Sequence, residues 1–385
     1  MALAAGAVSP LSSPVESRAS WNPLKCSGTG LPMNLTILVK VLAMVLLVTN
    51  HVRILPDPWL SFIPWIDSIP PVLFQRTLQT VFLISALAIV FNRRVQLSAL
   101  VLGATMLIAI VSSKAYYGNN KTFCGLMLFL TGLYKPGGPP FLRWQLAITY
   151  FGAGLNKALD GDWHTGVFFE NWAVNRLQQP WYIALDSILP PLVLARFVCW
   201  TTIVTELATV PCLLIPGLYY WGILANIFFQ SSLLLFTGTT FTLFFYSMTA
   251  ASLAFVNWPI DPVPVLYNAD SKFGRRTRKF FQPWDLDRLF LWKAYEPGVT
   301  ATNPLHLLLG DKSLSGFRAI RMMVLLNPIS YFAIAIAIAA LGDLPGPAVL
   351  GRRLIVATCL VLLMPPLAWI ADKSGFPAHG LEKAQ

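Results

Sequence analysis

Long apolar segments, separated by shorter polar ones, constrain what this chain can fold into more than any other feature. Many of them run for about 15–20 residues, the length that a helix needs to cross about 30 Å of hydrocarbon. Apolar residues make up 56% of the 385 residues and charged residues only 12%, about half the charged fraction of ordinary soluble domains. We therefore predict a polytopic membrane protein, an all-α bundle of about eight to ten transmembrane helices.

Ten apolar segments are candidates for these helices. They lie at about residues 35–52, 72–91, 97–113, 122–134, 141–157, 189–215, 218–236, 239–257, 323–341 and 353–371. Proline and glycine interrupt several of them, which membrane helices tolerate. The fourth segment is short enough to be re-entrant. No internal repeat is visible, which disfavours an inverted-repeat transporter.

The distribution of basic residues orients the bundle. Lysine and arginine are concentrated between residues 272 and 293, and the positive-inside rule places such a segment in the cytosol. Both termini are then cytosolic, and the segments 114–123 and 159–181 face outside. Arg352 and Arg353 fall on the outer side in this scheme, so either the rule is violated there or the last two spans form a shallow hairpin. Because basic cytosolic loops account for the net charge of +11, we do not infer nucleic-acid binding.

Cysteine and histidine residues show no pattern of a metal centre or of a disulfide framework. The five cysteines are scattered without a C-x-x-C pair, and three of them lie inside apolar segments. The four histidines are far apart in the sequence. We therefore expect buried, unpaired thiols and no bound metal.

Two charged residues in the apolar part of the chain are candidates for chemistry. Lys157 ends the fifth apolar segment, just before two acids, and Glu206 lies near the middle of the sixth. A lysine at a helix end is commonly snorkelling or ion-paired, but desolvation at the hydrocarbon boundary would also make its amine a base. A carboxylate in hydrocarbon is costly. Glu206 is therefore either a functional group or a protonated side chain that is bonded to a neighbouring helix, with Asn226, Gln230 or threonines as partners.

A family resemblance rests on residues 150–163, which run YFGAGLNKALDGDW. They resemble a segment of the vitamin K-dependent γ-carboxylase family and of its bacterial relatives with the HTTM (horizontally transferred transmembrane) domain. The resemblance extends over roughly residues 33–260 and implies an HTTM-like transmembrane bundle there. Lys157 matches the second lysine of the family's Lys-Lys pair, which acts as a base toward reduced vitamin K, and Asn156 matches the first. Glu206 falls where the family usually has an acid.

This resemblance implies that Lys157 and Glu206 are catalytic and that a reduced quinone is the cofactor. It also implies substrate-binding residues in the two outward segments: Asn119, Asn120, Lys121, Asp160, Asp162, Trp163 and His164. The chain departs from the family in having Lys121 in place of a histidine, no histidine in residues 225–241 and no large outward domain. Glutamate carboxylation is therefore not expected. A membrane oxidoreductase or oxygenase that acts on a quinol or another lipid-soluble substrate is consistent with Lys157.

Residues 264–281 interrupt the membrane pattern with a strand-like run, a polar turn and a basic helix, PVLYNADSKFGRRTRKFF. Residues 288–295 predict a second strand, and residues 310–323 predict a turn and a helix. One face of the basic helix is expected to hold its apolar side chains and a threonine. These are Phe273, Thr277, Phe280 and Phe281.

This order of elements resembles the DCC family of thioredoxin-like proteins, whose signature is a strand ending in Asp-Gly-Asp-Cys-x-x-Cys before an arginine-rich helix. Ser271 and Gly274 stand where the two cysteines would be. A serine hydroxyl cannot replace the thiolate in disulfide exchange. We therefore predict a small cytosolic α/β thioredoxin-like insert without redox activity. Its basic helix either binds anionic lipid or forms a solvated charged face, and the residues concerned are Arg275, Arg276, Arg278 and Lys279.

These assignments divide the chain into five parts. They are a flexible N-terminal tail at 1–32, the HTTM-like bundle at 33–260, the thioredoxin-like segment at 261–321, a C-terminal transmembrane hairpin at 322–372 and a tail at 373–385.

Three functions remain open. The first is the quinol-linked membrane enzyme. The second is a non-catalytic membrane protein for peptide maturation, immunity or scaffolding, which the missing histidines favour, and the third is a transporter. The expected partners are the lipid bilayer and a lipid-soluble or peptide substrate.

Overall fold

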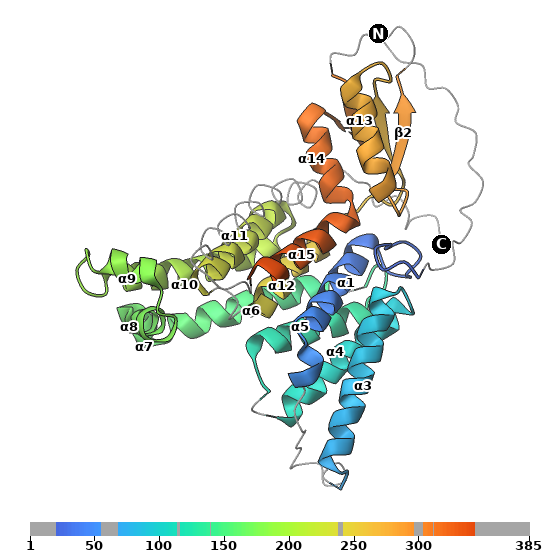
Figure 1. The fold of residues 1–385 in the computed structure, drawn as a ribbon. Helices are drawn as coiled ribbons and strands as arrows, with labels where there is room; N and C mark the ends of the chain where they lie inside the picture. The colour runs from blue at the N-terminus through green and yellow to red at the C-terminus, as the bar shows by residue number, and fades with distance from the viewer. Residues whose placement is uncertain are drawn as a thin grey trace.

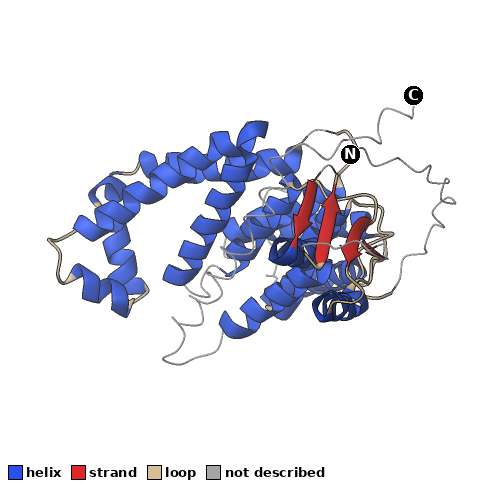
Figure 2. Cartoon of the chain, turned by 90° about the horizontal axis from the view of Figure 1, so that it is seen from above, coloured by secondary structure: helices blue, strands red, loops and turns tan. Residues whose placement is uncertain are grey.

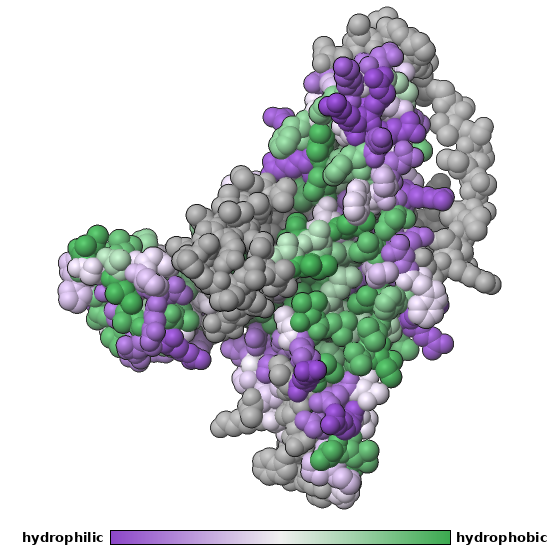
Figure 3. Space-filling view, in the orientation of Figure 1, coloured by the Kyte–Doolittle hydropathy of each residue, from purple (hydrophilic) through white to green (hydrophobic). Residues whose placement is uncertain are grey.

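The computed structural model describes residues 21–54, 68–113, 116–138, 140–237, 242–295, 303–310 and 312–342. They form a mostly helical structure with one small mixed sheet toward the C-terminal region (Figure 1). On the face shown in Figure 3, hydrophobic side chains gather over the helical bundle and hydrophilic ones over the small α/β unit. The predicted span at 353–371 and both predicted tail ends, residues 1–20 and 373–385, lie outside the described residues.

Up to residue 255, the regular elements of the described chain are all helices. The first are α1 (Met33–Val48), η1 (His51–Ile54), α3 (Pro71–Val90), α4 (Val95–Ser112), α5 (Asn119–Gly132) and α6 (Phe141–Ala158). Short helices follow, namely α7 (Gly161–Thr165), α8 (Val167–Asn171), η2 (Trp172–Arg176) and α9 (Pro180–Asp186). The last of this part are α10 (Val193–Leu214), η3 (Pro216–Leu218), α11 (Tyr219–Thr237), α12 (Thr242–Ala251) and η5 (Ser252–Phe255).

Four helices are long and apolar enough to cross a membrane, namely α3, α4, α10 and the continuous segment Pro216–Thr237 of η3 and α11. A fifth span results if α14 (Gly316–Leu326) and α15 (Pro328–Gly342), which are bent by 76° at the break between them, count as one. The apolar helices α1 and Leu243–Phe255 are shorter, and α6 carries several polar residues. The structure thus supports a multi-pass membrane protein. Among the described residues it has four or five candidate spans, fewer than the eight to ten predicted.

Several helix ends meet on one face of the bundle. Gln96, at the start of α4, donates from Nε2 to the carbonyl of Tyr134, just after α5, at 2.6 Å. Arg143, at the start of α6, donates from Nε to the carbonyl of Ala254, in η5, at 2.9 Å. Its guanidinium carbon lies 5.2 Å from the ring centroid of Tyr219, at the start of α11. Starts and ends of successive helices thus alternate, as they do in an up-and-down bundle.

Residues 21–32 lie on the same face, between the bundle and the sheet. Lys40 of α1 is fully buried, and its Nζ donates to two backbone carbonyls of this segment at 2.6 Å each. The amides of Cys26 and Ser27 donate to the carboxylate of Asp287, which precedes β2, at 2.9 and 2.7 Å. The segment therefore joins the first helix of the bundle to the α/β unit.

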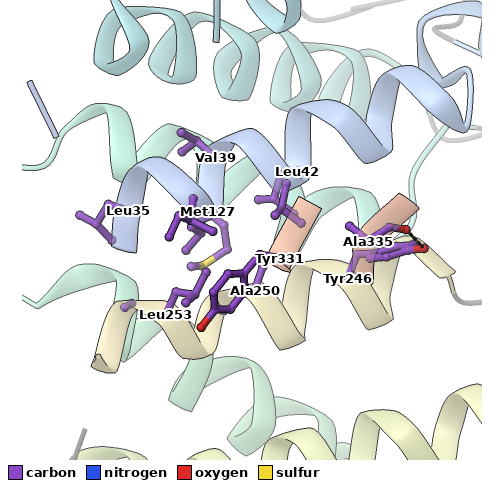
Figure 4. Close-up of a cluster of buried hydrophobic side chains, with 14 of the residues drawn as sticks. Leu35, Val39, Leu42, Met127, Tyr246, Ala250, Leu253, Tyr331 and Ala335 are labelled. Atoms are coloured by element: carbon purple, nitrogen blue, oxygen red, sulfur yellow. Dashed lines mark hydrogen bonds between the residues drawn. The ribbon is translucent and has the colours of Figure 1, made fainter. Parts of the chain in front are cut away.

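The core of the bundle lies around α1, most of whose side chains are buried. Figure 4 shows a cluster that draws on α1, α5, α12, η5 and α15. Its labelled members are Leu35, Val39, Leu42, Met127, Tyr246, Ala250, Leu253, Tyr331 and Ala335. The Tyr246 hydroxyl donates to the carbonyl of Ala335 at 2.9 Å. Helix α15, which follows the sheet in the sequence, thus returns to pack against the first helix.

The sheet, drawn in red in Figure 2, contains β1 (Val263–Tyr267), β2 (Phe290–Ala294), β3 (Leu305–Leu309) and β4 (Lys312–Ser315). Their order is β2-β1-β3-β4. β1 is parallel to β2 and antiparallel to β3, and β3 is antiparallel to β4. Alternate side chains of β1 and β3 are buried, as the two-residue period of a strand requires. The two predicted strands therefore form. The hairpin of β3 and β4 lies in residues that the sequence assigned to a loop and a turn, because four- and five-residue strands depend on a distant partner more than on their own pattern.

The helix α13 (Lys272–Phe281), which connects β1 to β2, packs on the sheet through the side that carries Gly274. Its buried residues are Gly274, Thr277 and Phe281, the i, i+3, i+7 spacing of one helix face. Phe273 and Phe280 are 43% and 64% exposed. With Thr277 and Phe281 they line one pocket against Ile320 and Val324 of α14, so the four residues share a face as predicted. Of the four, only Thr277 and Phe281 are buried.

Candidate functional site

Lys157 and Glu206 form an ion pair between α6 and α10. The Nζ atom of Lys157 lies 2.5 Å from Oε1 and 2.6 Å from Oε2 of Glu206. The side chain of Lys157 is 18% exposed and that of Glu206 is 5% exposed. Each charge neutralises the other in a region where an isolated charge would be costly. Two residues that are 49 positions apart, each a candidate from the sequence, are thus brought together.

Gly154 lets α6 and α10 approach closely enough for this pair. It precedes Lys157 by three residues, which places both on one side of α6. A Cβ atom on Gly154 would lie 2.9 Å from the Leu207 side chain and 3.2 Å from the Cβ atom of Glu206. A Cβ atom on Gly152 would have nothing within 4 Å. Of these two glycines, Gly154 is the one that the helix contact requires.

Aromatic rings flank the pair where the chain leaves α6. Nζ of Lys157 lies 5.1 Å from the ring centroid of Trp163, which stacks on Phe168 at 4.7 Å. His164 stacks on Trp200 of α10 at 5.2 Å, and its Nε2 lies 2.7 Å from a backbone carbonyl at the end of α6. Of the predicted substrate residues on α7, Trp163 therefore lies beside the pair, and His164 packs against Trp200 of α10.

The predicted substrate residues Asp160 and Asp162 are exposed and do not pair with Lys157. The carboxylate of Asp160 accepts from the amide of Asp162 at 2.9 Å and caps α7, which satisfies an otherwise unpaired donor of the first turn. Lys157 thus takes its carboxylate partner from α10 rather than from the two acids that follow it in the sequence.

The predicted substrate residues at the start of α5 form a separate cluster. The side-chain oxygen of Asn119 accepts from the Tyr117 hydroxyl at 3.0 Å, and that of Asn120 accepts from the amide of Lys121 at 2.9 Å. Nζ of Lys121 donates to the carbonyl of Tyr116 at 2.9 Å and lies 3.8 Å from its ring centroid. Within the described part of the chain, no hydrogen bond or ion pair joins this cluster to the ion pair of α6 and α10.

A buried polar network on α6 was not predicted. The hydroxyl of Tyr150 donates to Oδ1 of Asn226 at 2.6 Å and accepts from Nε2 of Gln230 at 3.1 Å. Asn226 and Gln230, which the sequence offered as partners for Glu206, therefore bond to Tyr150 instead. The seven-residue spacing from Tyr150 to Lys157, about two helical turns, is the signal that places both on one side of α6.

The basic residues of α13 divide into two groups. Arg275, Arg276 and Lys279 are exposed. Arg278 is directed toward the sheet, where it donates to the hydroxyl of Tyr267 and lies 5.2 Å from its ring centroid. Of the four predicted lipid-binding residues, three are thus accessible to an anionic surface, namely Arg275, Arg276 and Lys279.

Ser271 and Gly274, which the resemblance to the DCC family aligns with cysteines, have structural roles. The Ser271 hydroxyl caps α13 by accepting from the amide of Phe273 at 3.2 Å. A Cβ atom on Gly274 would lie 2.5 Å from the carbonyl oxygen of Asn268, so any side chain there would displace the backbone. The four cysteines among the described residues are free thiols outside this segment. The same residues contain no group of three His, Cys, Asp or Glu side chains that is placed to hold a metal ion.

Comparison with known proteins does not provide a family for this chain. No family model, no curated protein and no solved structure matches it. Its function is therefore inferred from the four or five candidate spans and from the geometry around Lys157 and Glu206.

Proposed function

We propose that this multi-pass membrane protein is an enzyme in which Lys157 acts as a base on a lipid-soluble hydroxyl compound such as a reduced quinone. The observation that carries the proposal is the Lys157–Glu206 ion pair. Because Glu206 is almost fully buried and Lys157 is partly accessible, a substrate would meet the amine first. The resemblance to carboxylase-like HTTM proteins, in which the matching lysine is a base, supports the same assignment.

Glu206 provides the acceptor for the proton that Lys157 must lose before it can act as a base. An ammonium group cannot accept a proton, so Lys157 must first become neutral. Transfer of a proton from the Lys157 ammonium to the Glu206 carboxylate, whose Oε1 lies 2.5 Å away, would give an amine and a carboxylic acid. The amine then takes the proton of the substrate hydroxyl, the O–H bond breaks, and the substrate anion lies beside the new ammonium. Deprotonation of this kind begins quinol oxygenation, the reaction class that the resemblance implies.

The rings around the pair suit a flat, apolar substrate. Phe168 is 41% exposed and Trp200 is 46% exposed, and each already stacks on a neighbour, Trp163 and His164 respectively. Offset stacking on such rings is favourable for an aromatic ligand. A quinol ring held there would bring its hydroxyl toward Lys157.

A second candidate function is a non-catalytic one, such as peptide maturation, immunity or scaffolding, in which the ion pair only locks α6 to α10. The close contact at Gly154 favours it, because a helix interface of this kind needs no substrate. Removing one partner of a buried pair costs about 3–5 kcal/mol. Loss of activity in a truncated variant alone would therefore not separate the two candidates.

The α/β unit supports a thioredoxin-like assignment with lost redox chemistry. This assignment to the thioredoxin fold comes from the resemblance, and the strand order β2-β1-β3-β4, the parallel β1–β2 pair and the antiparallel β3–β4 pair support it. Helix α13 lies between β1 and β2 in the sequence, as the first helix of that fold does. Ser271 caps α13, and Gly274 allows the backbone of α13 to approach that of Asn268. Neither residue carries a thiol, so we assign this unit no thiol–disulfide exchange.

The decisive experiment compares wild-type protein with Lys157→Arg in membranes that contain a reduced benzoquinone or naphthoquinone. Arginine keeps the positive charge and can pair with Glu206, but it does not deprotonate in proteins. We expect quinol consumption by the wild type and at least about a hundredfold loss in Lys157→Arg, the range seen when a general base is removed. The unfolding temperature of the variant should stay close to that of the wild type.

The matched control is Lys293→Ala, which removes an exposed lysine of β2 and should leave turnover unchanged. Wild-type membranes that consume neither quinol, or a Lys157→Arg variant as active as the wild type, would contradict the enzyme and favour the structural role.

A further inference from the structure

A cavity of about 1550 Å³ lies between the helical bundle and the α/β unit. Its walls come from residues 26–32, the start of α1, the end of α5, the start of α6, the residues after η5, the start of β1 and the end of β3. Arg143 in its wall is about 21 Å from Lys157 along the axis of α6, so the cavity is distinct from the ion-pair site. We propose that the cavity binds an anionic phospholipid, with the phosphate on cationic side chains and the apolar chain on the apolar walls.

Three cationic side chains line the cavity, namely Lys135, Arg143 and Arg288. Arg143 is held in place through its Nε, which donates to the carbonyl of Ala254 at 2.9 Å, and through the Tyr219 ring. Lys135 and Arg288 are exposed. No carboxylate of the described residues lies within 4.0 Å of any of the three. Their charges are thus available to a ligand, and the planar fork of an arginine matches phosphate oxygens.

Two acids also line the cavity, and they differ in availability. The carboxylate of Asp287 already accepts from the amides of Cys26 and Ser27. Asp261 is exposed and forms no ion pair within the described residues. Three cations against two acids give the cavity walls a net charge of +1, which favours an anion.

Apolar side chains in the same walls offer a surface for a lipid chain. Leu31, Leu35 and Leu142 are buried, whereas Leu133 and Phe141 are 46% and 45% exposed. These residues lie at or next to the ends of apolar helices, the level at which lipid head groups meet their chains. A water-soluble phosphate compound would leave this apolar surface uncovered, so we assign the phosphate to a lipid.

The test measures lipid binding to the purified full-length protein in detergent by native mass spectrometry. Phosphatidylglycerol is titrated beside phosphatidylcholine and glycerol 3-phosphate. We expect phosphatidylglycerol to bind at least about tenfold more tightly than either, and Arg143→Gln to remove that preference, because a charge-assisted hydrogen bond to phosphate is lost. Asp261→Asn should tighten the binding of phosphatidylglycerol, because it removes a like charge.

A second variant separates an effect on binding from an effect on folding, because Arg143→Gln also breaks the contact with η5. The double variant Lys135→Gln/Arg288→Gln changes only exposed side chains, and it should weaken phosphatidylglycerol binding by about tenfold. Lys293→Gln, an exposed cation of β2 outside the cavity, is the matched control and should change nothing. Equal affinity for the two lipids, no effect of the double variant, or a loss of binding in Lys293→Gln alone would overturn the site. Binding of glycerol 3-phosphate as tight as that of phosphatidylglycerol would overturn the lipid as its ligand.

Discussion

At the scale of single residues, three cationic side chains within the bundle each contact a partner on another element. Lys157 has the carboxylate of Glu206, buried Lys40 has two backbone carbonyls, and Arg143 has a carbonyl and a tyrosine ring. An unpaired charge among apolar helices would cost several kcal/mol. Each cation therefore ties its own helix to a second element, and these contacts restrict how the helices can pack.

Gly154→Ala tests the closest of these helix contacts. The new methyl group would meet the Leu207 side chain at 2.9 Å, and overpacking of this kind costs about 1–3 kcal/mol. We expect a lower unfolding temperature for the purified protein. Gly152→Ala is the matched control, because its methyl group enters open space and alanine is the better helix former, so its unfolding temperature should be unchanged or higher. Equal effects of the two substitutions would contradict the assigned contact.

At the scale of elements, α13 shows how two small residues set the position of a helix. Ser271 caps its first turn, and Gly274 allows its backbone to approach the carbonyl oxygen of Asn268. Once the helix packs through Gly274, Phe281 is buried and Phe273 and Phe280 are exposed. The pattern of apolar residues along α13 predicts a helix but leaves its rotation about its axis undetermined.

Substitutions at these two positions should differ in cost. Ser271→Ala removes a cap, with an expected loss of about 1 kcal/mol. Gly274→Ala should cost more, above about 2 kcal/mol, because the new Cβ atom meets backbone rather than a movable side chain. Hydrogen exchange of the β1 and α13 amides in the full-length protein measures both, and Lys279→Ala on the exposed face is the control. Wild-type protection in Gly274→Ala would show that the close approach is not needed.

At the scale of the whole molecule, the N-terminal segment 21–32 and several helix ends join the bundle to the α/β unit on one face. Asp287 holds this segment through the amides of Cys26 and Ser27, and Cys26 is 1% exposed. Burial raises the pKa of the Cys26 thiol well above its usual range, although the positive charge of Lys40 acts in the opposite direction. The thiol is therefore protonated and unreactive while the segment stays in place.

Asp287→Ala should release this segment. With the two amides unpaired, Cys26 becomes exposed, its pKa falls toward the ordinary range, and its thiolate reacts. We expect maleimide to label Cys26 at least about tenfold faster in a background where the other cysteines are serine. Asp261→Ala, which removes a nearby exposed acid, should leave the rate unchanged. An unchanged rate in Asp287→Ala would show that this carboxylate does not hold the segment.

The alternation of helix ends leads to a prediction about topology. Residues of α7 follow the far end of α6, whereas the sheet follows the end of η5, near the start of α6. Single cysteines at Thr165 and Asp270, both exposed, should therefore be labelled from opposite sides of sealed vesicles, with Asp270 on the cytosolic side. Labelling of both from one side would contradict the orientation.

Much of the local structure could be predicted from the sequence, because it depends on neighbours along the chain. Apolar length indicated membrane helices, and alternation and turn residues indicated β1 and α13. The β3–β4 hairpin was missed, because its short strands form on pairing with β1 rather than from their own pattern. Among the described residues, which exclude the predicted span at 353–371, the candidate spans are fewer than predicted, because apolar helices such as Met33–Val48 and Leu243–Phe255 are shorter than a full span.

By itself, the sequence determined that this chain is rich in membrane-length apolar segments, that Lys157 and Glu206 carry unusual charges for such segments, and that the insert has no cysteine pair. Only the tertiary structure decided which carboxylate Lys157 meets, that Asn119–Lys121 lies apart from it, and that a cavity forms where the α/β unit meets the bundle. The physical reason is that these contacts join residues far apart in the chain. Their geometry depends on how closely helices approach, at glycines such as Gly154, and the local pattern of residue types does not contain that distance.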